Sequence, residues 1–135
     1  MDSRKILFLA AVLGASTVAL GAFGAHSLHD TIVANPKGEE YWRLATEYAL
    51  PHAAALAGLA GYSAKEGGGR LAGAAARSWF FGSIIFAGTL MAMALGAPKW
   101  LGAITPLGGL AMLAAGAMRG FSGFGAARSA WDMLI

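Results

Sequence analysis

The chain contains no cysteine and few charged residues. Without cysteine it has no disulfide framework, no thiolate metal site and no cysteine nucleophile. Charged residues make up 13% of the chain, against about 25% in an ordinary soluble domain, while 57% of the residues are hydrophobic. This composition excludes a disordered chain. It also argues against an ordinary soluble globule of 135 residues, because such a globule has too little interior for so much apolar chain.

The few charges are confined to part of the chain. All 17 charged residues fall within 61 positions, and the other 74 positions form four uncharged runs, at residues 6–25, 48–62, 78–97 and 100–118. Long uncharged apolar runs are typical of helices that cross a membrane. The net charge of +3 is explained by basic loops beside anionic lipid, and no basic run with interleaved aromatics supports nucleic-acid binding. We therefore expect a lipid bilayer as the partner and no nucleic acid.

These runs predict an all-α, integral membrane four-helix bundle that forms a single domain, residues 1–135. The predicted spans are about 6–25, 41–62, 78–97 and 104–121, followed by a C-terminal tail at 122–135. The second span must begin before its uncharged run, because 15 residues give only about 22 Å of helix. It therefore carries Arg43 and Glu47, and Pro51 is expected to kink it.

The Lys and Arg residues predict the orientation of the bundle. If the N-terminus lies inside the cell, seven basic residues lie on the cytoplasmic side and three on the outer side. The seven are Arg4, Lys5, Lys65, Arg70, Arg77, Arg119 and Arg128; the three are Lys37, Arg43 and Lys99. Cytoplasmic loops are the ones enriched in Lys and Arg. We therefore expect a multi-pass protein of the bacterial cytoplasmic membrane with both termini in the cytoplasm.

Small residues recur every four positions in the predicted spans, which lets helix backbones approach closely. Such stripes either form a dimerisation face or pack the four helices against each other, and we favour internal packing. The stripes are Ala11, Ala15 and Ala19; Ala53, Ala57 and Gly61; Gly88, Ala92 and Gly96; Gly116 and Gly120. The glycines expected at helix contacts are Gly21, Gly24, Gly88, Gly108 and Gly109.

Ionisable and polar residues at membrane depth mark candidate functional sites. The predicted topology places five of them in the outer half of the bundle: His26, Glu47, Tyr48, His52 and Thr105. Tyr48 and His52 are four residues apart and share a helix face, whereas Glu47 and His52 do not. We expect Glu47 to pair with Arg43 one turn away and, in addition, to meet His26 and Thr105.

Three interpretations of this polar cluster remain open. His26 and His52 could ligate a metal or haem with Glu47 as a third ligand. Glu47 and His52 could instead move protons or a small solute. The third interpretation is structural, with the cluster hydrogen-bonded internally and to carbonyls freed by Pro51. No nucleophile elbow, phosphate loop, zinc helix motif or acid pair is present in the sequence, so we predict no enzymatic activity and no cofactor.

Four motifs make the chain resemble a known family. They are Gly21–His26 (GAFGAH), Glu47-Tyr48 followed by His52-Ala53, Phe86–Leu90 (FAGTL) and Ile104–Gly109 (ITPLGG). In this order they resemble the small membrane proteins called domain of unknown function 423, whose animal relative is transmembrane protein 256. Ala87 stands where the family pattern has serine, and Leu50-Pro51 also departs from that pattern. The resemblance covers roughly residues 1–120 and implies a four-helix membrane protein without an established activity.

The sequence therefore favours a structural or accessory subunit that packs in a larger membrane complex or forms a homo-oligomer. The small size, the short loops, the small-residue faces and the lack of a catalytic motif all point to this class. The alternative is a transporter, channel or proton-handling protein that uses the outer-half cluster. A haem- or metal-binding membrane protein is the lesser alternative.

Overall fold

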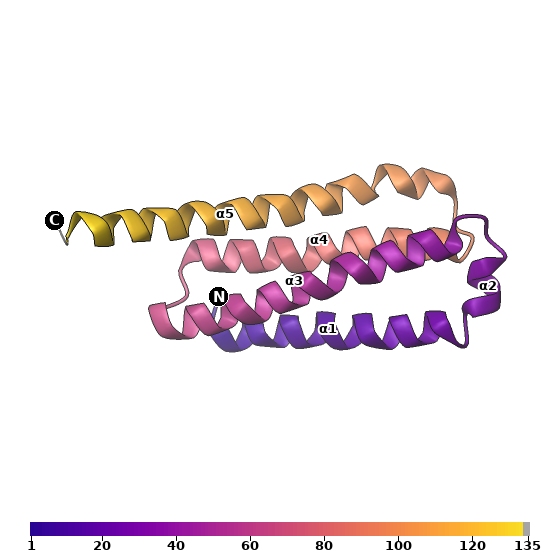
Figure 1. Ribbon diagram of the computed structural model, residues 1–135, viewed down its shortest axis with the longest axis horizontal. Helices are drawn as coiled ribbons and strands as arrows, with labels where there is room; N and C mark the ends of the chain where they lie inside the picture. The colour runs from indigo at the N-terminus through magenta and orange to yellow at the C-terminus, as the bar shows by residue number, and fades with distance from the viewer. Residues whose placement is uncertain (134–135) are drawn as a thin grey trace.

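The computed structural model is all-α (Figure 1). It describes residues 1–133, with side chains for residues 1–120 and Met133. Four long helices are joined by short connections, one of which holds the brief helix α2 and another the 3₁₀ turn η1. The elements are α1 (Ser3–Ala25), α2 (His29–Val33), α3 (Gly38–Glu66), α4 (Arg70–Ala94), η1 (Lys99–Ala103) and α5 (Thr105–Asp132).

The four long helices lie side by side in the order α1, α3, α4, α5 (Figure 1). α3 packs between α1 and α4, and α5 packs on α4. Within the described residues, α1 and α5 make no substantial contact with each other, and neither do α3 and α5. The predicted all-α packing of four main helices is therefore confirmed, and the structure adds that they lie in an open row.

Local signals explain where the helices begin and end. The side chain of Asp2 accepts a hydrogen bond from the Arg4 backbone N–H, which caps α1. Pro106 occupies the first turn of α5, where a missing N–H costs nothing. α4 ends at Ala94, three residues before the predicted end of the third span, because Gly96 turns the chain with a φ of 95°.

α5 does not end near residue 121 as predicted. It continues to Asp132, so most of the predicted tail at 122–135 is helical. The side chain of Arg128, which entered the predicted charge balance, lies outside the described side chains, and residues 134–135 lie outside the described backbone.

Three helical segments in the described part of the chain are long and apolar enough to cross a membrane. They are Ser3–Ala25, Arg70–Ala94 and Lys99–Gly120. α3 contains the predicted second span, 41–62, but is not one of the three. Its first turns carry Glu39, Glu40, Arg43 and Glu47. Because α1 and α4 cover two sides of α3, these sides do not face lipid, and fewer of the α3 side chains need to be apolar.

Small residues do form the helix contacts, but not in the predicted stripes. Of the eleven stripe residues, only Ala53 is buried and only Ala92 is half-buried; the other nine are exposed. The predicted internal packing of the stripes is therefore wrong. On α3 the buried residues follow a neighbouring face instead: Ala45, Ala49, Ala53, Leu56 and Ala60. In helices this rich in Ala and Gly, several faces carry only small side chains and allow close approach of a neighbouring helix. The four-residue spacing alone therefore does not identify the face that packs.

The predicted packing glycines fall into three groups. Gly24 and Gly108 lie where a Cβ atom would collide, against the Trp42 indole and the α4 backbone respectively. Gly21 and Gly109 make ordinary van der Waals contacts, and Gly88 is exposed with nothing near its Cβ position. Other tight glycines were not predicted, among them Gly82, which faces Gly108, and Gly38, which lies against the Ile32 and Ala94 carbonyl groups.

Candidate functional site

A groove of about 650 Å³ lies between α3 and α5. It exists because both helices pack on α4 without packing on each other, so the face of α4 between them is left uncovered. Trp79 and Phe86 from α4 form part of its lining. The remaining lining comes from Tyr48, Pro51, His52 and Ala55 of α3 and from Gly109, Met112, Leu113, Gly116 and Ala117 of α5.

His52 and Tyr48 share the groove, as their four-residue spacing predicted. His52 Nδ1 lies 2.7 Å from the carbonyl oxygen of Tyr48. A carbonyl oxygen can only accept, so Nδ1 carries a proton and donates it to this bond. In the neutral imidazole, Nε2 is then an acceptor, and no partner for it occurs among the described residues. His52 therefore offers one free hydrogen-bonding atom in a mostly apolar groove.

Aromatic contacts join α3 to α4 and α3 to α5 around the groove. The rings of Tyr48 and Phe86 tilt against each other with centroids 5.3 Å apart, which joins α3 to α4 near one end. Towards the other end, the Arg119 guanidinium of α5 lies 4.7 Å from the centre of the Tyr62 ring of α3. Cation–π contacts of this kind stabilise helix pairs modestly. Of these two contacts, the second joins α3 to α5, and neither Arg119 nor Tyr62 is among the residues that line the groove.

Glu47 lies outside the groove. Its carboxylate pairs with Arg43 one turn back, as predicted, and both side chains are more than half exposed. The expected convergence of His26 and Thr105 on Glu47 is wrong: no hydrogen bond in the described residues joins Glu47 to either of them. Thr105 instead pairs with Thr89, with Oγ1 atoms 2.8 Å apart, and is buried between α4 and α5.

His26 and His52 do not approach each other. α1 and α3 run antiparallel, and the close contacts of Gly14 with Ala53 and of Gly24 with Trp42 set their register. This register places His26 at the level of Tyr41, roughly 16 Å along the helix axis from His52. Within the described residues, no group of three His, Cys, Asp or Glu side chains could hold a metal ion. The predicted polar cluster is thus divided between separate places on the molecule.

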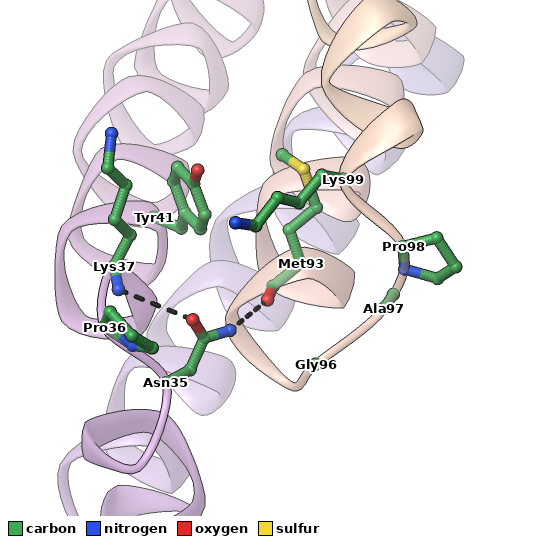
Figure 2. A pocket seen from close by; sticks show the side chains of 9 residues that line it. All are labelled: Asn35, Pro36, Lys37, Tyr41, Met93, Gly96, Ala97, Pro98 and Lys99. Carbon is green, nitrogen blue, oxygen red and sulfur yellow. Dashed lines mark hydrogen bonds between the residues drawn. The ribbon is translucent and has the colours of Figure 1, made fainter.

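A second hollow, not predicted from the sequence, lies at the end of the molecule that holds α2 and η1 (Figure 2). We call it the lysine cleft; its volume is about 600 Å³. It is lined by Asn35, Pro36, Lys37, Tyr41, Met93, Gly96, Ala97, Pro98 and Lys99. The available sequence signal was that Lys37 and Lys99 both belong to the connections predicted on one side of the membrane.

Asn35 holds the two walls of the lysine cleft together. Its Nδ2 donates to the carbonyl oxygen of Met93 at 2.6 Å and, more weakly, to that of Ala94 at 3.4 Å. Its Oδ1 accepts from the Lys37 backbone N–H at 3.4 Å (Figure 2). The last carbonyls of a helix lack partners within the helix, so Asn35 satisfies the end of α4 from a distant connection.

A chain with several apolar helices long enough to cross a bilayer, and with large apolar side chains exposed on them, is a membrane protein of the multi-span class. A comparison with protein families identifies its family within this class. The chain belongs to the family described as protein of unknown function (DUF423), whose model matches residues 20–109. The first motif begins at Gly21 and the fourth ends at Gly109, so together the motifs extend over nearly the whole of this match.

Bacterial membrane proteins are among the relatives. The UPF0382 inner membrane protein YgdD of Escherichia coli K12 is 33% identical over 126 residues, which cover 87% of this chain and 88% of that protein. The UPF0382 membrane protein YwdK of Bacillus subtilis 168 is 34% identical over 110 residues, which cover 82% and 88% of the two chains. No solved structure matches the chain. The resemblance and the bacterial cell membrane predicted from the sequence are thereby confirmed.

Proposed function

We propose that this protein is a structural or accessory subunit of a membrane assembly, and that the groove between α3 and α5 receives a transmembrane helix of another chain. One observation carries the proposal: α3 and α5 both pack on α4 and leave a groove between them, and their contact through Arg119 and Tyr62 lies outside its lining. In a four-helix protein that functions alone, closing the row into a bundle would cover this face of α4. An unfilled groove that runs along a helix suits a further helix.

The lining of the groove favours a helix as its occupant. Ala55, Gly109, Gly116 and Ala117 are small and let an incoming backbone approach closely. The α5 part of the lining extends from Gly109 to Ala117, about 12 Å along the axis, which is roughly two turns of a helix lying beside it. His52 Nε2 would accept one hydrogen bond from this helix, and such bonds contribute to helix association in membranes.

Proton handling or transport has less support from the geometry. Glu47 pairs with exposed Arg43 outside the groove, and none of the described lining residues of the groove is Asp or Glu. A relay that uses both Glu47 and His52 would need the two side chains on one path, whereas they lie on different faces of α3. The arrangement is also not one that assembles a catalytic pair, so we propose no enzymatic activity.

We further propose that all four long helices span the bilayer with both termini in the cytoplasm. α3 lies between α1 and α4, which are both long and apolar enough to span, so it occupies the same layer. Met1 lies beside Gly68 and Gly73, which brings the N-terminus to the end where Lys65 and Arg70 also lie. Basic residues gathered at one end favour that end as the cytoplasmic one.

Site-specific photocrosslinking in intact cells tests the groove. A crosslinking residue at Leu113, inside the groove, should give one defined protein adduct, and one at exposed Val18 on α1 should not give that adduct. A Gly116→Phe change should abolish the adduct by filling the groove, whereas Gly120→Phe, one turn further along α5 and outside the lining, should not. A second copy of this chain, recognised by its mass, would make the assembly a homo-oligomer. An adduct with lipid alone would overturn the proposal.

A further inference from the structure

The lysine cleft combines two basic side chains with a phenol and lacks an acidic partner. Lys37 and Lys99 line it on opposite walls, and Figure 2 shows the Lys99 side chain extending across it towards Tyr41 and the Lys37 side chain running along α3 beside Tyr41. None of the described residues that line it is Asp or Glu. The nearby ion pair, Arg43 with Glu47, is satisfied within α3 and leaves the two lysines without a carboxylate partner in the described residues.

Attraction to the C-terminus of α4 does not explain why two lysines line the cleft. A helix C-terminus attracts cations, and Lys99 follows α4 closely in the sequence. The last-turn carbonyls of Met93 and Ala94, however, already accept hydrogen bonds from Asn35. Glu39 and Glu40 begin α3 nearby but do not line the cleft. The positive charge of the cleft is therefore available to a bound anion.

The cleft lies where two candidate membrane spans end and begin, the level at which lipid headgroups are expected. It adjoins the end of one candidate span, Arg70–Ala94, and the beginning of another, Lys99–Gly120. Trp100, next to Lys99, is 65% exposed, and tryptophan exposed at the end of a span is typical of the membrane–water interface. A ligand at this position would keep its charged group in the cleft and its apolar part beside the helices.

The walls of the cleft are held in place before any ligand binds. Asn35 ties one wall to the other, Pro36 and Pro98 restrict the two connections, and Gly96 adopts a left-handed conformation at the turn. Gly38 lies so close to the Ala94 carbonyl that a Cβ atom there would be 3.2 Å from its oxygen. A preformed site spends less free energy on ordering its side chains when it binds.

From these observations we propose that the lysine cleft binds the headgroup of an anionic phospholipid. The phosphate lies between the ammonium groups of Lys37 and Lys99, and the Tyr41 hydroxyl donates a further hydrogen bond. The apolar lining residues Met93, Ala97 and Pro98 suit the glycerol and upper acyl region better than they suit hydrated inorganic phosphate. The site lies apart from the groove between α3 and α5, so it does not depend on the partner helix proposed there.

Native mass spectrometry of the intact protein tests the site directly. The protein is reconstituted in phosphatidylglycerol and phosphatidylcholine at equal amounts and released in mild detergent, and the retained lipids are counted. We expect the protein to retain phosphatidylglycerol about tenfold more than phosphatidylcholine, as two lysines at a membrane surface would produce. The K37Q/K99Q variant should lose this preference, whereas K37R/K99R should keep it.

The control variant is K65Q/R70Q, which removes two exposed basic residues at the opposite end of the molecule. It should retain phosphatidylglycerol as the unchanged protein does. Equal loss in K65Q/R70Q and K37Q/K99Q would show a general charge effect and would overturn the site, and so would unchanged retention in K37Q/K99Q. A third arm adds inorganic phosphate at about 10 mM, a concentration that screens exposed charges only partly. Complete displacement of the lipid by this phosphate would identify a free anion as the ligand and would also overturn the proposal.

Discussion

The indole ring of Trp42 on α3 lies directly over Gly24 on α1. A Cβ atom at residue 24 would be 2.5 Å from Cε2 of the indole, closer than atoms of real side chains approach. Trp42 is itself buried, and its Nε1 has no hydrogen-bond partner. This contact joins the end of α1 to the beginning of α3, so the absence of a side chain at Gly24 sets how closely the two helices approach.

We therefore expect Gly24→Ala to destabilise the protein by about 1–3 kcal/mol, because the buried indole has little room to move. Gly88→Ala is the matched control, since residue 88 is a helical glycine with nothing near its Cβ position. Alanine is the better helix former, so this change should stabilise the protein slightly, by up to about 1 kcal/mol. Thermal unfolding of both variants in one detergent measures the difference; equal midpoints would contradict the packing role of Gly24.

Glu47→Gln should have only a small effect on stability. Glu47 and Arg43 are more than half exposed, and an i, i+4 pair of this kind contributes less than about 1 kcal/mol. Unfolding of E47Q, R43Q and the double variant in the same detergent should give midpoints close to that of the unchanged protein. A loss of 2 kcal/mol or so in E47Q alone would mean that Glu47 has a buried partner, in conflict with its exposure.

The hydrogen bond between Thr89 and Thr105 should couple α4 to α5. Their hydroxyl oxygens are 2.8 Å apart, and Thr105 is buried. Hydrogen bonds between membrane helices contribute about 0.6 kcal/mol on average and up to about 1.7 kcal/mol. A double-mutant cycle with Thr89→Val and Thr105→Val should give a coupling energy in this range.

A second cycle provides the control for the threonine pair. Thr17 donates to the Leu13 carbonyl within α1, away from α5. Thr17→Val and Thr105→Val should therefore be additive. Additivity of the Thr89 and Thr105 changes as well would show that the bond contributes nothing to holding α5 in place.

Asn35→Asp should weaken the connection between the α2–α3 loop and the end of α4. The carboxylate keeps the acceptor that faces the Lys37 N–H but loses the donor that bonds the Met93 carbonyl, and it places negative charge against that oxygen. We expect a loss of about 1–3 kcal/mol, larger than for Asn35→Ala, together with faster hydrogen exchange at the Gly96 amide. If N35D exchanged no faster than the unchanged protein, the hydrogen bond would not be holding the turn.

Local chemistry made much of the secondary structure predictable. Long uncharged runs indicated the helices of the row, and the Arg43–Glu47 pair followed from a spacing of four residues. The end of α4 was misplaced by three residues because the left-handed turn at Gly96 interrupts an apolar run that hydropathy reads as continuous. The predicted end of the last helix, near residue 121, was wrong, because a helix can continue through residues that are not apolar and α5 does so up to Asp132.

The candidate sites were less predictable, since each depends on residues far apart in the chain. Tyr48 and His52 were correctly assigned to one face, but the groove they share depends on residues of α4 and α5. Asn35 and Met93 are 58 positions apart, and no local pattern links them. The expected meeting of Glu47 with His26 and Thr105 assumed that polar residues at one depth also face each other. Depth leaves the direction of a side chain around its helix undetermined.

The sequence by itself determined the membrane class, the family, the all-α fold and the approximate limits of the helices, because each of these follows from composition and short-range chemistry. Only the tertiary structure decided which helix faces meet, that the helices form an open row, and where the groove and the lysine cleft lie. The physical reason is that lipid, and not water, surrounds these helices. In lipid an outward face is as apolar as an inward one, so hydrophobic periodicity does not mark the interior. The choice among several small faces then depends on contacts such as Gly24 with Trp42 and Gly82 with Gly108.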